Sequence, residues 1–156
     1  MWQRRDAFVA VRGPQTKLDP ALVALRNDPS CRDPPMLHYG VVFDRDVLKS
    51  YATREDIQIS DVEATLDAKT QEMLLQRAVR DRLESKCKFA LQFTIPFAQD
   101  DDRCLLALDD TRQLRHTKSK WWNQRAESVI QILKRELQLK STVKAKWWWN
   151  FRYGVG

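Results

Sequence analysis

The residues best suited to binding chemistry are the cations and tryptophans of the C-terminal third. From residue 111 to residue 156 the chain has eleven Lys or Arg against two acids, and it holds five of its six tryptophans there. The first 110 residues carry the other sixteen bases and nineteen acids. Cationic side chains bind phosphates and aromatic rings stack on bases, so this composition predicts a surface for nucleic acid or another acidic partner. A membrane surface or ordinary packing also fits, and the sequence leaves these alternatives open.

Residues 143–153 alternate between two kinds of side chain. Odd positions hold Val, Ala, Trp, Trp, Phe and Tyr, whereas even positions hold Lys144, Lys146, Trp148 and Arg152 together with an asparagine. A period of two predicts a β-strand with its aromatic face in the core and its cations on the other face. Core packing accounts for the odd-position rings. Trp148 shares the cationic face, where it either stacks on a base or covers the alkyl chains of its neighbours.

A second group of candidate contacts lies at the start of a predicted helix. Trp121 stands beside an apolar helix stripe, with Lys118, Lys120 and Arg125 near it in the sequence. The free amides of a helix N-terminus also favour anions. If this helix start and the cationic strand face share one side of the fold, they form one continuous positive surface. We therefore expect partner or nucleic-acid contacts from Lys118, Lys120, Trp121, Arg125, Lys144, Lys146, Trp148 and Arg152.

The sequence offers no recognisable catalytic, metal or cofactor motif. His38 and His116 are far apart, the cysteines lack metal-ligand spacing, and no glycine-rich phosphate loop is present. Aspartates cluster at 100–102 and again at 109–110. If residues 98–102 form a turn, these two groups lie roughly 20 Å apart, too far to share one ion. We expect no cofactor, and the interpretation leans against an enzyme.

Two long helices are predicted to carry the core. Apolar residues at steps of three and four indicate helices at about 61–86 and about 120–139. Ser60 and Glu63 have the spacing of a capping box before the first of them. A break in that helix is expected around Asp67.

Strands are predicted where the period changes to two. Alternation over 88–97, a run of aspartates and an apolar segment at 103–109 together indicate an antiparallel hairpin. The segment 143–153 adds a strand, and 7–11 and 37–43 are candidates for two more. The predicted fold is therefore α+β, with an antiparallel sheet packed against the two long helices.

The bulk composition bounds the class of protein. A chain of 156 residues with 43% hydrophobic and 31% charged residues falls in the globular range, so we expect one domain over 1–156. No secretory signal and no long apolar run is found, which favours an intracellular protein, cytoplasmic or nuclear. We interpret the function as a non-catalytic binding module whose basic, tryptophan-containing C-terminal surface binds nucleic acid or another acidic partner. The alternative is a protein-interaction or self-association domain whose C-terminal strand pairs with another chain.

Overall fold

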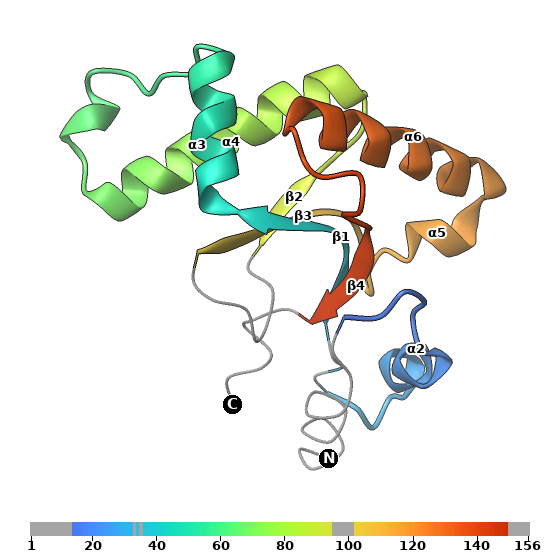
Figure 1. Ribbon diagram of the computed structural model, residues 1–156. Coiled ribbons are helices and arrows are strands. Elements are labelled where there is room, and N and C mark those ends of the chain that lie inside the picture. Colours follow the sequence, from blue (N-terminus) through green and yellow to red (C-terminus); the bar gives the residue numbers. More distant parts are fainter. Residues whose placement is uncertain (1–13, 33, 35, 95–101, 150–156) are drawn as a thin grey trace.

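The computed structural model describes residues 14–32, 34, 36–94 and 102–149 (Figure 1). Within these residues the sheet has four strands in the spatial order β2-β3-β1-β4, and each neighbouring pair is antiparallel. The predicted α+β fold with an antiparallel sheet is therefore confirmed. The strands are β1 Leu37–Asp44, β2 Gln92–Thr94, β3 Arg103–Asp110 and β4 Lys146–Trp149.

Helices cover one face of this sheet. Figure 1 shows α3, α4 and α6 along that face, and α2 beside the end of β4. None of the helices in the described part of the chain is long and apolar enough to span a bilayer. The helices are α2 Pro20–Asn27, α3 Arg45–Arg54, the 3-10 turn η1 Glu63–Thr65, α4 Ala68–Cys87, α5 Arg115–Lys118 and α6 Lys120–Glu136.

The helix predicted at 61–86 begins later, at Ala68. Asp67 is its N-cap, and its carboxylate accepts a hydrogen bond from an amide in the first turn, so the break predicted around this residue is confirmed. The capping box of Ser60 and Glu63 also forms. It closes only the turn η1, because the backbone becomes extended directly after that turn. A capping box fixes where a helical turn starts, but it does not fix how long the helix runs.

Two predicted strands begin later in the structure. Within the described residues the segment 88–97 contributes β2, because Lys88 adopts a left-handed conformation with φ of 53° at the end of α4 and the chain becomes extended only after it. The segment 143–153 contributes β4, which begins at Lys146. By contrast, the strands predicted at 37–43 and 103–109 are confirmed. The predicted strand positions 7–11, 95–97 and 150–153 lie outside the described residues.

The apolar stripe predicted for the second long helix, α6, is confirmed. Trp122, Ala126, Val129, Ile130 and Leu133 of α6 are all buried. The helix was predicted to reach residue 139 but ends at Glu136, and two residues later the backbone turns left-handed, with φ of 53°. A left-handed residue cannot continue a right-handed helix, so the helical period ends there.

Two apolar clusters lie on the helix-covered face. The larger one joins the middle of β1 and β3 to α4 and α6, with Val41, Leu106, Val79 and Leu133 each 0% exposed. The smaller one joins α2 to the sheet edge through Leu22, Leu37, Trp147 and Trp149. The rings of Trp147 and Trp149 are therefore core residues, as the two-residue alternation predicts.

An ion cluster joins the ends of α3, α4 and α6. The ammonium group of Lys86 lies 2.9 Å from a Glu55 carboxylate oxygen and 2.7 Å from one of Glu136. The Arg54 guanidinium donates to the backbone carbonyl of Glu136 over 2.7 Å. The hydrogen bond from Lys86 lowers the pKa of Glu136, and the carboxylates of Glu136 and Glu55 raise the pKa of Lys86.

Acid should weaken the fold in part through Glu136. Because its pKa in the folded state lies below the ordinary 4.5, its ion pair stabilises the fold above pH 4.5, and this contribution is lost as pH falls through the folded-state pKa. Below pH 4.5 we expect the free energy of unfolding to fall less for Glu136→Gln than for the wild type. The difference should be under about 1 kcal/mol, because solvent screens the pair. Denaturant titrations at neutral and acidic pH measure it.

A second glutamate on the same helix provides the control for this experiment. Glu127 is exposed, so Glu127→Gln should keep the acid dependence of the wild type. The same acid dependence in Glu136→Gln and the wild type would contradict the assignment.

Candidate functional site

The most exposed large aromatic side chain of the described helices and strands stands at the start of α6. Trp121 is 68% exposed, and Lys118 and Lys120, which precede it in the sequence, are exposed as well. Ser119 begins the helix by accepting a hydrogen bond from the Trp122 amide at its hydroxyl oxygen. Successive helix residues are about 100° apart, so burial of Trp122 in the core turns Trp121 toward solvent.

The end of α4 is held against this helix start. The Arg125 guanidinium donates a hydrogen bond to the backbone carbonyl of Cys87, the last residue of α4. Lys88, the next residue, is exposed. The Arg115 guanidinium stands 5.9 Å from the centroid of the Phe89 ring. Segments that are far apart in the sequence thus contribute cations to one region.

We call this region the basic corner. It contains four of the residues predicted from sequence, but Arg125 is half-buried and part of its role is to join α4 to α6. Sequence spacing did not identify the other two cations: Lys88 is placed by the packing of the end of α4 on α6, and Arg115 belongs to the short helix α5. Its members are Lys88, Arg115, Lys118, Lys120, Trp121 and Arg125.

The predicted strand residues lie elsewhere. Trp147 packs on the helix side of the sheet, so the neighbouring Lys146 and Trp148 point to the opposite face. Trp148 is half-buried, and within the described residues its indole nitrogen is buried without a hydrogen-bond partner. Lys144 is exposed in the loop before β4. Arg152 lies outside the described residues.

The eight predicted residues therefore do not share one face of the sheet. The basic corner belongs to the helix layer, whereas Lys146 and Trp148 belong to the other side of the sheet. Alternation along a strand separates neighbouring side chains by the thickness of the sheet. The single continuous positive surface considered from the sequence thus becomes two separate groups.

A buried carboxylate fixes the position of α5, which carries Lys118. The side chain of Asp109 is 0% exposed, and it accepts hydrogen bonds from the amides of Arg115 and His116. The His116 Nδ1 atom lies 2.8 Å from Asp109 Oδ2, within hydrogen-bonding distance. The imidazole ring also contacts Trp147, with centroids 5.0 Å apart. Asp109 and His116 therefore anchor the helix to the sheet.

The side chain of the neighbouring Asp110 also binds backbone amides. Asp110 Oδ1 accepts hydrogen bonds from the amides of Arg112 and Gln113, at 2.7 and 2.8 Å. The acids at 109–110 thus organise the turn that leads into α5. Among the described residues, no group of three or more His, Cys, Asp or Glu is placed to hold a metal ion.

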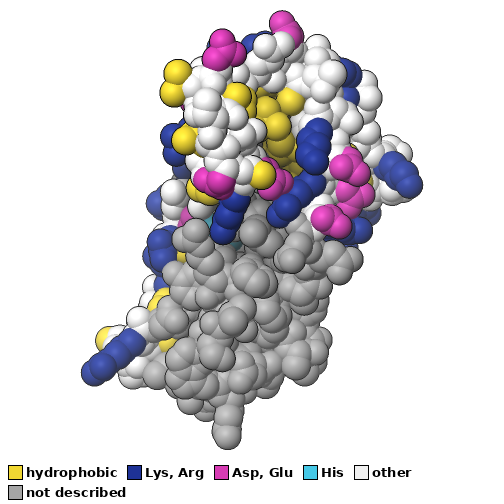
Figure 2. Space-filling model, turned by 90° about the vertical axis from the view of Figure 1, so that its left-hand side faces the viewer, with side chains coloured by type: hydrophobic (Ala, Val, Ile, Leu, Met, Phe, Trp, Pro, Cys, Tyr) yellow, Lys and Arg dark blue, Asp and Glu magenta, His cyan; other side chains and the backbone are white. Residues whose placement is uncertain are grey.

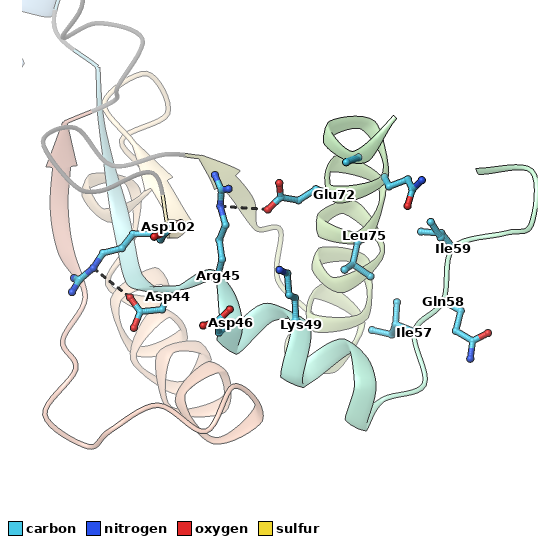
Figure 3. Close-up of a pocket in the computed structure, with 13 residues that line it drawn as sticks. Asp44, Arg45, Asp46, Lys49, Ile57, Gln58, Ile59, Glu72, Leu75 and Asp102 are labelled. Atoms are coloured by element: carbon cyan, nitrogen blue, oxygen red, sulfur yellow. Dashed lines mark ion pairs between the residues drawn. The ribbon is translucent and has the colours of Figure 1, made fainter. Parts of the chain in front are cut away.

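A groove lies away from the basic corner, where α3 meets the start of α4. It has a volume of about 990 Å³, and Figure 3 shows its lining side chains. Ile57, Ile59 and Leu75 are its main apolar residues. Arg45 pairs with Glu72 across it at 3.4 Å. The walls of this groove come from separate elements, so no local sequence pattern predicts it.

The Arg45–Glu72 ion pair links α3 to α4 at the groove, as its dashed line in Figure 3 shows. A second pair, between Arg103 and Asp44 at 3.5 Å, lies at the sheet end of the groove. Both pairs are partly exposed, so they contribute little to stability and chiefly fix the positions of the charges. Comparison with protein-family models, with curated proteins and with solved structures found no match for this chain.

Proposed function

We propose that this protein is a non-catalytic binding module that recognises single-stranded nucleic acid through the basic corner. The observation that carries the proposal is Trp121, which is 68% exposed and directly follows the exposed segment that contains Lys118 and Lys120. An exposed ring can stack on any base, and one stacking contact contributes about 1–3 kcal/mol. Lys118 and Lys120, just before the ring in the sequence, supply cations for the backbone phosphates of the same strand.

Electrostatics at the start of α6 supports the same ligand. The first turn of α6 has no acidic residue to offset the positive end of its helix dipole. Lys88 and Arg115 extend the positive charge toward the end of α4. A cationic region with one exposed ring is the arrangement that single-strand binding uses, with cations along the backbone and an aromatic side chain against a base.

The residues of the C-terminal strand form a second, separate candidate contact. Lys144 is exposed and Lys146 is half-buried, whereas the partial burial of Trp148 leaves less of its ring for stacking. The proposal therefore gives the corner the main role. A long single strand that passes around the edge of the sheet would reach both groups.

We expect a fluorescently labelled oligothymidylate to bind the full chain and to dissociate as salt is added. Trp121→Ala should weaken binding at least about fivefold, because it removes the stacking platform. Lys118→Ala with Lys120→Ala should weaken it and should lower the slope of log K against log salt by about 1.4, since each phosphate contact on a single strand contributes about 0.7. Fluorescence anisotropy over a salt series measures both quantities.

Variants that lose the same charge elsewhere distinguish binding at the basic corner from non-specific attraction to a basic protein. Lys69 and Arg77 are exposed on α4, away from the corner, and replacing both with alanine should leave the affinity within about twofold. The triple variant Lys144→Ala, Lys146→Ala, Arg152→Ala tests the strand group. Absence of binding at low salt, or equal losses in the corner and control variants, would refute the proposal.

Self-association through the C-terminal strand has less support. The amide of Gln15 donates to the carbonyl of Trp147 over 2.9 Å, and the amide of Trp147 donates back over 2.7 Å. The backbone groups of Trp147 that face away from β1 are thus already used. A second chain would have to displace Gln15 to pair there. Sedimentation velocity over a range of concentrations tests this alternative directly.

A further inference from the structure

The segment between α3 and α4 is both acidic and apolar. We call residues 55–67 the acidic arch. It carries no Lys or Arg, although the chain as a whole has a formal net charge of +6. Two isoleucines of the arch, Ile57 and Ile59, line the groove. The five acids of the arch are Glu55, Asp56, Asp61, Glu63 and Asp67.

Hydrogen bonds hold the arch against α4. The Gln71 side-chain amide donates to the carbonyls of Ala64 and Leu66, at 3.0 and 2.6 Å. The capping box contributes two more bonds, at 2.9 and 3.2 Å, between Ser60 and Glu63. One wall of the groove is therefore fixed in place by bonds that its own residues make.

The groove has an apolar floor with a charged margin. Figure 2 shows hydrophobic side chains in a hollow in the upper part of one face, with charged groups beside it. Of the three bases in the lining, Arg45 and Arg103 form ion pairs with Glu72 and Asp44. Asp46 and Asp102 also line it, so the acids outnumber the bases even before the arch is counted. Glu55 of the arch is already paired with Lys86 and Arg82. The remaining excess of acids in the lining and the arch complements a basic partner.

The secondary structure around the groove indicates which type of partner segment, helix or strand, would fit it. The buried residues of α4 are Val79, Leu83 and Cys87, all in its C-terminal half, so the half beside the groove lacks a fully buried side chain. Residues of α3, the acidic arch and α4 make up most of the lining, and the sheet adds only Asp44 and Arg103. A groove formed mainly between helices is suited to an amphipathic helix.

We propose that this groove binds a basic amphipathic helix of a partner protein. Apolar side chains of the helix would pack on Ile57, Ile59 and Leu75, and its Lys and Arg residues would face the acidic arch. The site is separate from the basic corner, and the inference does not depend on nucleic-acid binding.

A designed peptide of about four helical turns provides the probe, with leucines at positions i, i+3, i+4 and i+7 and lysines at the remaining positions. We expect the labelled peptide to bind the full chain in fluorescence anisotropy. A second peptide with glutamate at every lysine position should bind at least about tenfold more weakly, because the arch repels it. A third peptide of the same composition as the first, in scrambled order, lacks the apolar face and should also bind more weakly.

Variants of the protein test whether the peptide binds in the groove. Ile59 is half-buried, so Ile59→Asn should keep the fold and weaken the basic peptide about tenfold, with Ile59→Ala as a milder second variant. Asp56→Asn with Asp61→Asn should weaken it about fivefold. Asparagine also tolerates the left-handed backbone of Asp56, whose φ is 51°. The control is Asp28→Asn with Glu127→Gln, two exposed acids outside the arch and the groove lining, and it should leave the affinity unchanged.

Three outcomes would overturn the proposal. The first is equal affinity for the basic and acidic peptides. The second is wild-type affinity in both groove variants, once circular dichroism shows that they are folded. The third is a concentration-dependent mass that Ile59→Asn abolishes, because the occupant would then be a second copy of this chain rather than a partner helix.

Discussion

Replacing Gly40 with alanine should destabilise the fold by at least about 3 kcal/mol, at or above the upper end of the usual cost of overpacking. A Cβ atom at this position would lie 2.1 Å from the carbonyl oxygen of Leu106 and 2.7 Å from the Cα of Ala107. Both contacts are to backbone atoms of β3, which cannot rotate away as a side-chain tip could. The two strands would have to separate near the centre of the sheet.

The reason for glycine here is space and not backbone conformation. The φ of Gly40 is not positive, so an alanine could adopt the same backbone. The register of β1 on β3 shifts between Tyr39 and Gly40, and this irregularity accompanies the close approach of the two backbones. The requirement for glycine therefore comes from strand pairing, which the local sequence does not reveal.

Denaturant unfolding followed by circular dichroism measures the effect, and the soluble yield reports it if the variant does not fold. Val42→Ile is the matched control, because it adds one carbon to a half-buried side chain on the same strand and the same side of the sheet. That control should change the free energy of unfolding by less than about 1 kcal/mol. A Gly40→Ala protein with the wild-type unfolding midpoint would show that the strands do not approach so closely.

The second large effect is expected at Asp109. Its carboxylate is fully buried, accepts hydrogen bonds from the amides of Asp110, Arg115 and His116, and lies within hydrogen-bonding distance of the His116 ring. Asp109→Ala removes the acceptor and leaves these donors without it, so we expect a loss of about 3–5 kcal/mol. Asp109→Asn keeps one acceptor oxygen and should lose less.

A double-mutant cycle divides this loss between the ring and the backbone. If the His116 ring carries much of it, Asp109→Ala will cost less in a His116→Ala background than in the wild type. If the backbone amides dominate, the two costs will be nearly equal. Denaturant titrations of the four proteins measure the coupling energy.

An exposed aspartate shows whether burial is the reason for the effect. Asp28 accepts hydrogen bonds from the amide and hydroxyl of Ser30 but lies on the surface, where water can replace it. Its change to alanine should therefore have only a small effect. A small loss at Asp109 as well would mean that α5 and its cations are held by other contacts.

The sequence by itself determined which side chains of α6 and β4 face inward. Periods of two and of about 3.6 residues are properties of a single strand or helix, so they predicted the buried stripe of α6 and the inward rings of Trp147 and Trp149 without knowledge of any neighbour. The same reasoning placed Trp121 beside that stripe. The direction of these side chains follows from the geometry of their own helix or strand.

Element ends were less well determined. Residues 61–66 belong to the acidic arch and do not form the first turns of α4. The chain leaves the helical conformation after η1, and Asp67 then caps a new helix start. Lys88 interrupts the first predicted strand in the same way, by entering the left-handed region. Where a helix or strand begins or ends depends on the backbone angles of a few residues. A periodic sequence pattern extends over many residues and does not resolve these positions.

Only the tertiary structure decided which elements meet. The packing of α4 on α6 brings Lys88 toward Trp121, and strand alternation against a helix-covered face moves Lys146 and Trp148 to the other side of the sheet. The groove beside α4 forms because the acidic arch is bonded back onto that helix. Contacts of this kind join residues far apart in the chain, and their geometry follows from how whole faces bury one another. No local pattern of residue types contains that information.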